Sequence, residues 1–287
     1  MRKARIAIIG TGNIGSDLLV KIQRSPYLEC TKFIGRNLNS KGMLFARNFN
    51  VELSDKSIDA IVEDPDCCDI VIDATSAAVH RVNAPILKKL GKFTIDMTPS
   101  QIGEMCIPAI NAKEALALDN INLVTCGGQA VVPIAYAISR VSKVMYHEMV
   151  SVIASKSAGP GTRDNIDEFT QTTKKALLKF TNATDAKAII TLNPADPPIK
   201  MHNTLYSIVE NPDMEAIRNS VKQMVEEIRH YVDGYKLTVE PMLEHGRIVT
   251  MVTVEGHGDY LPPYSGNLDI INCAAISMAE RFAEAKL

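Results

Sequence analysis

Near its N-terminus the chain reads Arg5-Ile6-Ala7-Ile8-Ile9-Gly10-Thr11-Gly12-Asn13-Ile14-Gly15. The apolar run that ends at Ile9 predicts a buried strand, and a helical pattern begins at Ile14. A G-x-G-x-x-G loop in this context typically binds a dinucleotide: its glycines permit a tight turn, close approach of a pyrophosphate, and close helix–strand packing. The N–H groups of the helix N-terminus would face the phosphates. The predicted cofactor residues here are Gly10, Gly12, Asn13, Ile14 and Gly15.

Short apolar runs recur along the first half of the chain and alternate with helical stretches. They are Cys30–Ile34, Asp69–Ala74, Lys92–Asp96 and Asn122–Thr125. This alternation predicts a parallel sheet with crossover helices. After residue 126 strands and helices are mixed. We therefore expect an α/β fold, with a Rossmann dinucleotide-binding domain over residues 1–125 and a second α/β (α+β) domain over residues 126–267.

Composition excludes several classes of function. The 287 residues carry a net charge of -2, which gives no electrostatic case for nucleic acid or an anionic membrane surface. No apolar run approaches the ~18 residues of a membrane span, and the basic start lacks a signal-peptide layout. The six cysteines and six histidines show no metal-ligand spacing. A chain with this cysteine usage is expected in the reducing cytoplasm, with no metal and mostly buried thiols.

The loop after the second predicted strand reads Gly35-Arg36-Asn37-Leu38-Asn39-Ser40. NAD-binding folds usually carry an acidic residue there, which binds the ribose hydroxyls of the adenosine. Arg36 could instead face a 2′-phosphate and favour NADP, or it could be a solvated loop arginine. Both interpretations stay open at this point.

Cys126 lies in the stretch Val124-Thr125-Cys126-Gly127-Gly128-Gln129, between a buried strand and an apolar helical run from Ala130 to Val141. Pro133 fits the first turn of that helix. The helix N-terminus is expected to lower the pKa of the thiol, and the two glycines to expose N–H groups that could hold an oxyanion. Cys126 is thus the candidate nucleophile, while the other five cysteines are expected to be structural.

A third loop, Ser155–Arg163, is small, polar and basic, and precedes a helix at about Asp164, a composition typical of an anion-binding loop. The loop Tyr260–Asp269 is comparable and opens the last helix.

At these residues the chain resembles the acylating acetaldehyde dehydrogenases, which convert a short aldehyde, NAD and coenzyme A to acyl-CoA. The matching stretches run in order through nearly the whole chain. They are Ala7–Gly15, Asp73–Ala77, Val124–Gln129, Ala154–Arg163 with Asn165–Phe169, Leu192–Ala195 and Gly266–Ile270.

The resemblance implies a role for each matching position. Cys126 would be the acyl-thioester nucleophile. The cofactor site would include the glycine turn and, further along the chain, Thr75, Ser76, Ser157, Ala158, Gly159, Pro160, Gly161, Thr162, Arg163, Asp164, Asn165 and Asn267. The second domain would serve catalysis and dimerisation, and the C-terminal helix, residues 268–287, would return to the first domain. The family implies a homodimer, a 4-hydroxy-2-oxovalerate aldolase as partner, and a place in aromatic hydrocarbon catabolism.

The chain departs from the family pattern at several positions. Asn203 stands where the family often has an aspartate that helps to organise the site, so Asn203 can hydrogen-bond there but cannot take a proton. The stretch His257–Tyr260 lacks the histidine usual before the tyrosine, and about twenty residues are missing between Tyr235 and Val254 relative to the family pattern. If the missing part normally meets the aldolase, that partnership is lost here.

The expected reaction has Cys126 attacking the aldehyde, hydride passing to the nicotinamide, and coenzyme A releasing the acyl group. Acetaldehyde is the expected substrate, with propanal as a further short aldehyde. Two alternatives stay open: a phosphorylating semialdehyde dehydrogenase, for which Arg140 and Arg163 are the candidate anion-binding residues, and a non-catalytic cofactor-binding scaffold or redox sensor.

Overall fold

The chain forms two compact units. The computed structural model describes residues 2–159, 163 and 166–287. Unit 1 comprises residues 1–123, 259–261 and 272–287, and unit 2 comprises residues 124–258 and 262–271. The helix α10 (Gly266–Lys286) begins in unit 2 and ends in unit 1. Five predicted cofactor residues lie outside the described residues: Pro160, Gly161, Thr162, Asp164 and Asn165.

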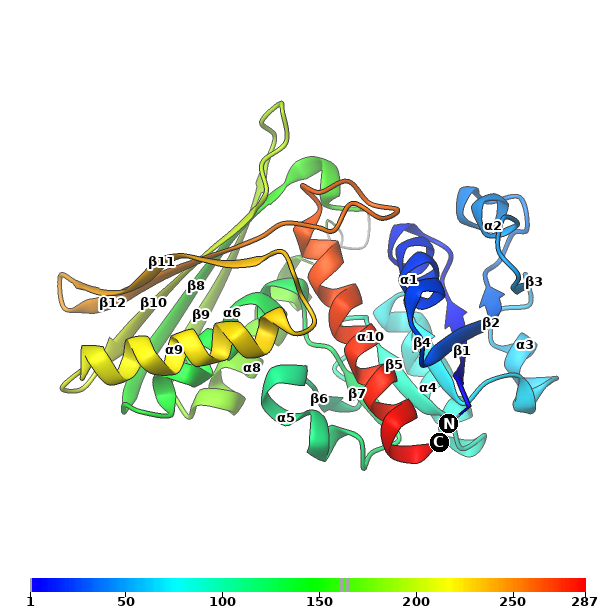
Figure 1. Ribbon diagram of the computed structural model, residues 1–287, viewed down its shortest axis with the longest axis horizontal. Coiled ribbons are helices and arrows are strands. Elements are labelled where there is room, and N and C mark those ends of the chain that lie inside the picture. The colour runs from blue at the N-terminus through cyan, green and yellow to red at the C-terminus, as the bar shows by residue number, and fades with distance from the viewer. Residues whose placement is uncertain (1, 160–162, 164–165) are drawn as a thin grey trace. The chain divides into compact units, whose positions relative to one another are not determined.

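Unit 1 is built on a seven-stranded parallel sheet in the order β3-β2-β1-β4-β5-β7-β6 (Figure 1). The strands are β1 (Ala4–Ile9), β2 (Leu28–Ile34), β3 (Glu52–Ser54), β4 (Ile70–Asp73), β5 (Phe93–Asp96), β6 (Glu104–Met105) and β7 (Asn120–Asn122). The helices are α1 (Asn13–Arg24), α2 (Lys41–Ala46), α3 (Asp59–Val62), α4 (Ala77–Lys89) and α5 (Pro108–Ala115), with a 3-10 turn at Pro65–Cys67. The order 3-2-1-4-5 is that of a doubly wound dinucleotide-binding fold, which confirms the Rossmann prediction. Such sheets bind ligands at the carboxyl ends of the strands where the order reverses, here between β1 and β4.

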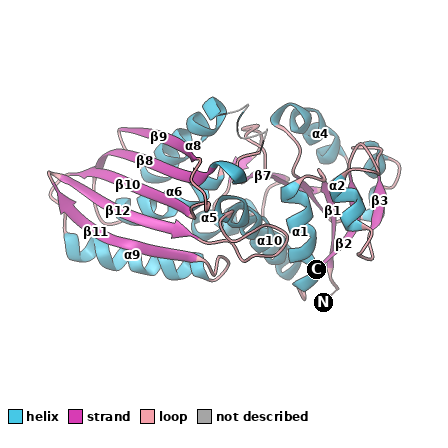
Figure 2. Cartoon of the chain, turned by 90° about the horizontal axis from the view of Figure 1, so that it is seen from above, coloured by secondary structure: helices cyan, strands magenta, loops and turns pink. Residues whose placement is uncertain are grey.

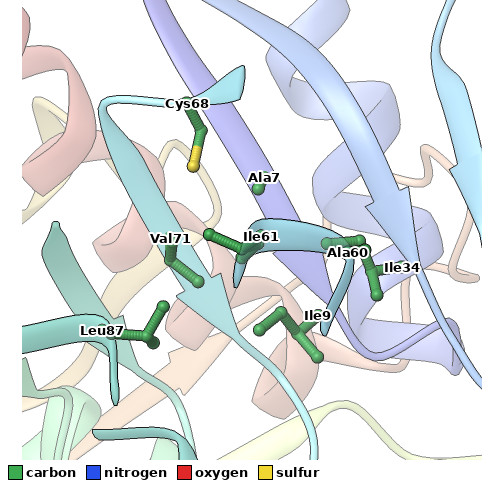
Figure 3. Close-up of a cluster of buried hydrophobic side chains, with 8 residues drawn as sticks. All are labelled: Ala7, Ile9, Ile34, Ala60, Ile61, Cys68, Val71 and Leu87. Carbon is green, nitrogen blue, oxygen red and sulfur yellow. The ribbon is translucent and has the colours of Figure 1, made fainter. Parts of the chain in front are cut away.

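One face of this sheet is held by a cluster of buried apolar side chains (Figure 3). Ala7 and Ile9 of β1 share that face because side chains alternate along a strand. Ile61 of α3 is fully buried in the same cluster. The other members are Ile34, Ala60, Cys68, Val71 and Leu87. Since burying one large aliphatic side chain contributes about 1.5–3 kcal/mol, the cluster holds β2, β1 and β4 together below the carboxyl ends that carry the glycine loop.

The segment 259–261 also belongs to unit 1 and is bonded to α1. Asp259 accepts a hydrogen bond from Lys21 Nζ at 2.7 Å, and the N–H of Tyr260 donates to Asp17 Oδ1 at 3.2 Å. Asn272 Nδ2 donates to Asp17 Oδ2 at 2.8 Å. These bonds fix the helix that follows the glycine loop, so Asp259, a departure from the family pattern, has a structural role here.

Unit 2 is built on a five-stranded sheet in the order β11-β12-β10-β8-β9 (Figure 2). The strands are β8 (Val144–Ala154), β9 (Asp185–Asn193), β10 (Met201–Val209), β11 (Tyr235–Glu244) and β12 (Arg247–Val254). The pair β8 and β9 is parallel and the other neighbours are antiparallel. The helices α6 (Cys126–Ser139), α8 (Ile166–Thr181) and α9 (Met214–Arg229) pack on one face of this sheet, and a 3-10 turn, Ser155–Ser157, follows β8.

Most predicted elements are present, and three differences matter for the site. The predicted strand Asn122–Thr125 ends at Asn122, so Thr125 is free to cap the next helix. That helix begins at Cys126, so placing Pro133 in its first turn is wrong: the proline lies inside the helix and removes one helical N–H donor. Sequence patterns do not predict β10, because its buried face carries polar residues that break the alternation of apolar and polar positions.

Across the described ranges, 2–159, 163 and 166–287, no helix combines the length and the apolar character needed to cross a membrane. Nor do these residues bring three His, Cys, Asp or Glu side chains together in a way that could hold a metal ion.

Candidate functional site

The three glycines of the first loop differ in what surrounds them. Gly10 has φ +113°, and a Cβ there would lie 2.5 Å from the carbonyl oxygen of Ala74. A Cβ on Gly15 would lie 1.9 Å from the carbonyl oxygen of Gly10. These two glycines are required by the chain itself, for the turn and for close packing of helix on strand. A Cβ on Gly12 would meet nothing within 4 Å. The open space at Gly12 is where a pyrophosphate approaches the backbone in this fold.

Helix α1 begins directly on this loop, with Asn13 and Ile14 as its first residues. Its N-cap, Gly12, has no side chain to bond the N–H groups of the first turn. Those donors and the positive end of the helix dipole favour an anion at this position. The residues around Gly12 therefore fit the pyrophosphate of a dinucleotide.

The loop after β4 lies beside the glycine loop, because a Cβ on Gly10 would also come within 3.2 Å of the Thr75 nitrogen. Asp73 at the end of β4 accepts hydrogen bonds from the N–H of Thr75 at 3.1 Å and from its hydroxyl at 2.5 Å. Ser76 caps α4 by accepting a hydrogen bond from the N–H of Val79 at 3.4 Å. The structure thus brings Thr75 next to the glycine loop, with Ser76 the following residue.

A buried polar network behind this loop was not indicated by sequence patterns. His80 Nδ1 lies 2.9 Å from Asp73 Oδ2, and its Nε2 lies 3.1 Å from Asn120 Nδ2 and 3.6 Å from Asp96 Oδ2. Burial lowers the pKa of His80, but the hydrogen bond to Asp73 and the charges of both aspartates outweigh burial, so the pKa is raised. Burial opposes ionisation of Asp73 as well, yet its bonds to His80, Thr75 and Asn83 leave its pKa lowered. The bonds of Asp73 to His80, Thr75 and Asn83 therefore anchor the loop that carries Thr75.

Arg36 lies just past the end of β2 and is exposed. Its guanidinium makes no hydrogen bond or ion pair with any residue that the structure describes. The loop that carries it touches the glycine loop, since the hydroxyls of Thr11 and Ser40 are 3.4 Å apart. Arg36 is accordingly free to meet a ligand at this end of the sheet.

In unit 2, Cys126 is the first residue of α6, and the two residues before it determine its position. Val124 has φ 60°, a left-handed conformation that costs a β-branched residue on the order of 1–3 kcal/mol. Thr125, the N-cap, accepts a hydrogen bond from the N–H of Gly128 at 2.9 Å. Its hydroxyl lies 2.7 Å from that of Thr173. The turn at Val124 and the cap at Thr125 fix the position of Cys126 as the first residue of α6.

The prediction that the helix N-terminus gives Cys126 a low pKa is wrong. Burial raises the pKa of the thiol to about 12, and the N–H groups of Gly127 and of Cys126 itself only partly oppose this effect. Burial raises the free energy of the thiolate by more than the hydrogen bonds from two N–H groups lower it. The thiol is therefore protonated at neutral pH.

The predicted role of the glycines after Cys126 also needs correction. The N–H of Gly128 is used by Thr125, so only the donors of Cys126 and Gly127 face the sulfur. A Cβ on Gly127 would lie 2.9 Å from Met149 Cε and 2.9 Å from Phe169 Cζ. Gly127 therefore serves close packing against β8 and α8.

Asn203 lies in the middle of β10 on the face that packs against α6, and it is 1% exposed. Its Oδ1 accepts a hydrogen bond from Ser151 at 2.7 Å, while its Nδ2 has no partner among the described residues. Ser151 is two residues along β8 from Met149, the neighbour of Gly127, and residues so spaced point to one face. Asn203 thus offers an unused, buried N–H₂ donor on the surface that carries the start of α6.

The predicted anion-binding loop is partly described. Ser157 is buried and its hydroxyl donates to the carbonyl of Ala154 at 2.8 Å, and Ala158 is also buried. A Cβ on Gly159 would meet open space. Arg163 folds back on the loop, donating from Nε to the Ala158 carbonyl at 3.1 Å and from Nη2 to Ser155 Oγ at 2.8 Å.

Asn267, the second residue of α10, is 1% exposed, and its Oδ1 has no partner among the described residues. A buried amide oxygen without a donor is an unpaired polar group, which usually marks a place for a ligand or a water. The predicted residues thus fall into two groups. Unit 1 holds those of the glycine loop, Arg36, Thr75 and Ser76, whereas unit 2 holds Cys126, Asn203, Asn267 and the Ser155–Arg163 loop.

Both units resemble known proteins along nearly their whole length. The family described as prokaryotic acetaldehyde dehydrogenase, dimerisation, matches residues 126–262, and the one described as semialdehyde dehydrogenase, NAD binding domain, matches residues 5–116. An acetaldehyde dehydrogenase of Pectobacterium atrosepticum is 54% identical over 282 residues, covering 97% of this chain and 95% of that protein. One of Spirochaeta aurantia is 50% identical and covers 98% and 95%. The crystal structure of aspartate semialdehyde dehydrogenase II of Vibrio cholerae, complexed with ASA, is 16% identical with a TM-score of 0.64 over 100% of both chains, and shares the fold.

Proposed function

The chain belongs to the acetaldehyde dehydrogenase family, with a first unit of the NAD-binding type, and from this premise we propose that it is a coenzyme A-acylating enzyme. Acetaldehyde, and by extension propanal, would be oxidised to the acyl-CoA through a thioester on Cys126. The observation that carries the proposal is the position of that thiol at the start of α6, where the N–H groups of Cys126 and Gly127 face the sulfur.

The reaction needs no preformed thiolate to balance. The sulfur of Cys126 bonds to the aldehyde carbon while the thiol proton ends on the carbonyl oxygen, giving a thiohemiacetal. The residues around Gly12 would hold a nicotinamide dinucleotide, which would supply the acceptor for the hydride that leaves that carbon. The hydroxyl proton leaves to water, and the carbonyl re-forms as a thioester. The thiol of coenzyme A then attacks the thioester carbon, and its proton goes to the sulfur of Cys126.

Asn203 is proposed to donate a hydrogen bond to the reacting oxygen. Its Nδ2 is buried without a partner among the described residues, whereas its Oδ1 is held by Ser151. An amide so oriented can only donate toward a ligand, so it stabilises negative charge on oxygen as that charge develops. Removing one such donor typically costs about 3 kcal/mol of transition-state stabilisation.

The cofactor is proposed to lie across the glycine loop, with its pyrophosphate at Gly12 and the first turn of α1. Gly10, Asn13, Ile14, Gly15, Thr75 and Ser76 would line that part of the site. Ser157 to Asn165 and Asn267 are proposed as cofactor-binding residues from the family resemblance. The open space at Gly12 and the uncapped helix N-terminus support this placement.

A homodimer is the proposed assembly, formed through the face of the five-stranded sheet that α6, α8 and α9 leave bare. That face carries exposed apolar side chains, among them Ile208 at 46% and Met251 at 36% exposure. The match of residues 126–262 to a dimerisation family supports it. A 4-hydroxy-2-oxovalerate aldolase that supplies the aldehyde is a further proposed partner, to be sought by co-purification, and the cytoplasm is the proposed compartment.

The phosphorylating alternative needs two arginines that are free to bind anions, and both candidates are bonded to other residues of the chain. Arg163 is bonded to Ser155 and Ala158, and Arg140 donates from Nη2 to the Ser220 hydroxyl at 2.9 Å. Both guanidinium groups are thus occupied by the chain itself.

The test is absorbance at the nicotinamide band with purified protein, acetaldehyde and either coenzyme A or phosphate. We expect reduction that depends on coenzyme A, loss of turnover in Cys126→Ala with cofactor binding kept, and in Asn203→Leu a fall in kcat of roughly a hundredfold. Dependence on phosphate would favour the semialdehyde reaction instead. Cofactor binding without turnover on any short aldehyde would favour the non-catalytic scaffold.

A further inference from the structure

We propose that the loop after β2 forms a site for the 2′-phosphate of NADP, built around the Arg36 guanidinium with Lys41 and Ser40, and that the chain binds NADP more tightly than NAD. The inference rests on the proposed cofactor site at the glycine loop and specifies which dinucleotide that site prefers.

The first observation is where this loop lies. The hydroxyls of Thr11 and Ser40 are 3.4 Å apart, and a Cβ on Gly42 would lie 1.9 Å from the Thr11 carbonyl oxygen. A Cβ on Gly35 would come within 2.9 Å of Thr11 Cγ2. The residues on both sides of Arg36 are therefore packed on the middle of the glycine loop. In this fold the end of β2 is where the adenosine ribose lies when the pyrophosphate is on that loop.

The second observation is the charge of the loop. From Gly35 to Asn50 the chain has no Asp or Glu, while Arg36, Lys41 and Arg47 are all exposed. Binding of NAD at this place normally relies on a carboxylate that accepts hydrogen bonds from the ribose hydroxyls. No residue of the loop can supply one.

The third observation is that the two cations nearest the glycine loop are unengaged. Neither Arg36 nor Lys41 makes a hydrogen bond or ion pair with another residue in the part of the chain that the structure describes. Two of the carboxylates that follow the loop are paired with lysines: Glu52 with Lys32 at 3.2 Å, and Glu63 with Lys56 at 2.6 Å. A guanidinium can bind a phosphate through two parallel N–H donors, a geometry suited to a 2′-phosphate.

Binding of adenosine fragments tests the proposal without requiring turnover. Calorimetric titration would compare 2′,5′-ADP with 5′-AMP on the full chain carrying Cys126→Ala. We expect 2′,5′-ADP to bind at least about tenfold more tightly, since hydrogen bonds to charged groups are the strong ones. Arg36→Gln should remove at least about tenfold of the 2′,5′-ADP affinity and change 5′-AMP binding by less than about twofold. Lys41→Gln should act in the same direction with a smaller effect.

Arg47→Gln is the matched control, because it removes an exposed arginine at the C-terminal end of α2, the short helix that begins at Lys41. It should leave both affinities unchanged. Equal affinity for the two fragments in the parent protein, or equal losses in Arg36→Gln and Arg47→Gln, overturns the proposal. If 5′-AMP binds and 2′,5′-ADP binds no better, only the 2′-phosphate site fails and the dinucleotide site stands. If neither fragment binds, the proposed cofactor site itself has failed.

Discussion

Thr125 connects two hydrogen bonds that hold the start of the helix carrying Cys126, and replacing it tests how that thiol is positioned. Thr173 donates its only hydroxyl proton to the Phe169 carbonyl at 2.8 Å. The hydroxyl of Thr125, 2.7 Å away, must therefore be the donor to Thr173, and its lone pairs accept the N–H of Gly128 at 2.9 Å. Thr125 is 5% exposed, so water does not replace these partners readily.

Thr125→Val keeps the shape of the side chain and removes the hydroxyl. The N–H of Gly128 is then buried without an acceptor, which costs about 1–3 kcal/mol and agrees with about 0.5–2 kcal/mol for a lost N-cap. Thr173 keeps its bond to Phe169 and loses only a donor, a smaller effect. We expect a loss of about 2 kcal/mol in the free energy of unfolding. Thr125→Ser keeps both bonds and loses one methyl group, so it should cost about 1 kcal/mol or less.

The assay is urea unfolding followed by circular dichroism, with two transitions fitted if the units unfold separately. Alkylation of Cys126 gives a local readout: because burial raises its pKa, a frayed first turn should make Thr125→Val react faster than the parent at pH 8. The reasoning fails if Thr125→Val is as stable as the parent, or if Thr125→Ser costs more than Thr125→Val.

Three further outcomes follow from burial and charge. Iodoacetamide at pH 7 should label Cys67 before Cys126, because a hydrogen bond with the thiol of Cys68 lowers the pKa of Cys67 whereas burial raises that of Cys126 to about 12. Peptide mass spectrometry that finds Cys126 labelled first would refute this. His80→Gln should cost about 1–2 kcal/mol in the free energy of unfolding at pH 6. The deficit should shrink as pH rises, because the raised pKa of His80 stabilises the folded protein fully below the unfolded pKa of about 6.5 and no longer does so above the folded pKa. A deficit that is constant from pH 6 to 9 contradicts this. Ile61→Ala should cost about 2–3 kcal/mol in chemical unfolding, while Val62→Ala, next along α3 and 43% exposed, should cost less than about 0.5 kcal/mol.

The glycine loop could be predicted from sequence because each glycine answers a local requirement. Backbone atoms lie so close to Gly10 and Gly15 that only glycine fits at either position. The spacing of the glycines in the sequence is therefore enough to predict the conformation of the loop. Five strands of unit 1, β1, β2, β4, β5 and β7, were predictable for a related reason: they are largely buried and read as continuous apolar runs. The short strands β3 and β6 are more exposed and were not predicted.

The buried network around His80 and the strand β10 could not be predicted in the same way. His80 is joined to Asp73, seven residues away, and to Asn120, forty residues away, and no local pattern marks such pairs. On β10, Asn203 and Ser207 occupy buried positions, where a pattern search expects apolar residues. The hydrogen-bond partners of these two side chains, Ser151 and His147, lie on the neighbouring strand β8. These partners are therefore seen only in the folded sheet.

The pKa of Cys126 shows why a helix N-terminus alone is a weak sign of a reactive thiolate. Cys126 is half-buried, and two N–H groups face its sulfur, but desolvation by burial is the larger effect and raises the pKa of the thiol. A protonated resting thiol is also the form least open to oxidation, since thiolates are the species that oxidise. In the proposed reaction an acyl group passes from one thiol to another, so the nucleophile needs to gain charge only when a carbonyl is present to share it. The donor left open on Asn203 is suited to act at that moment, because its hydrogen bond gains strength as charge develops on the oxygen.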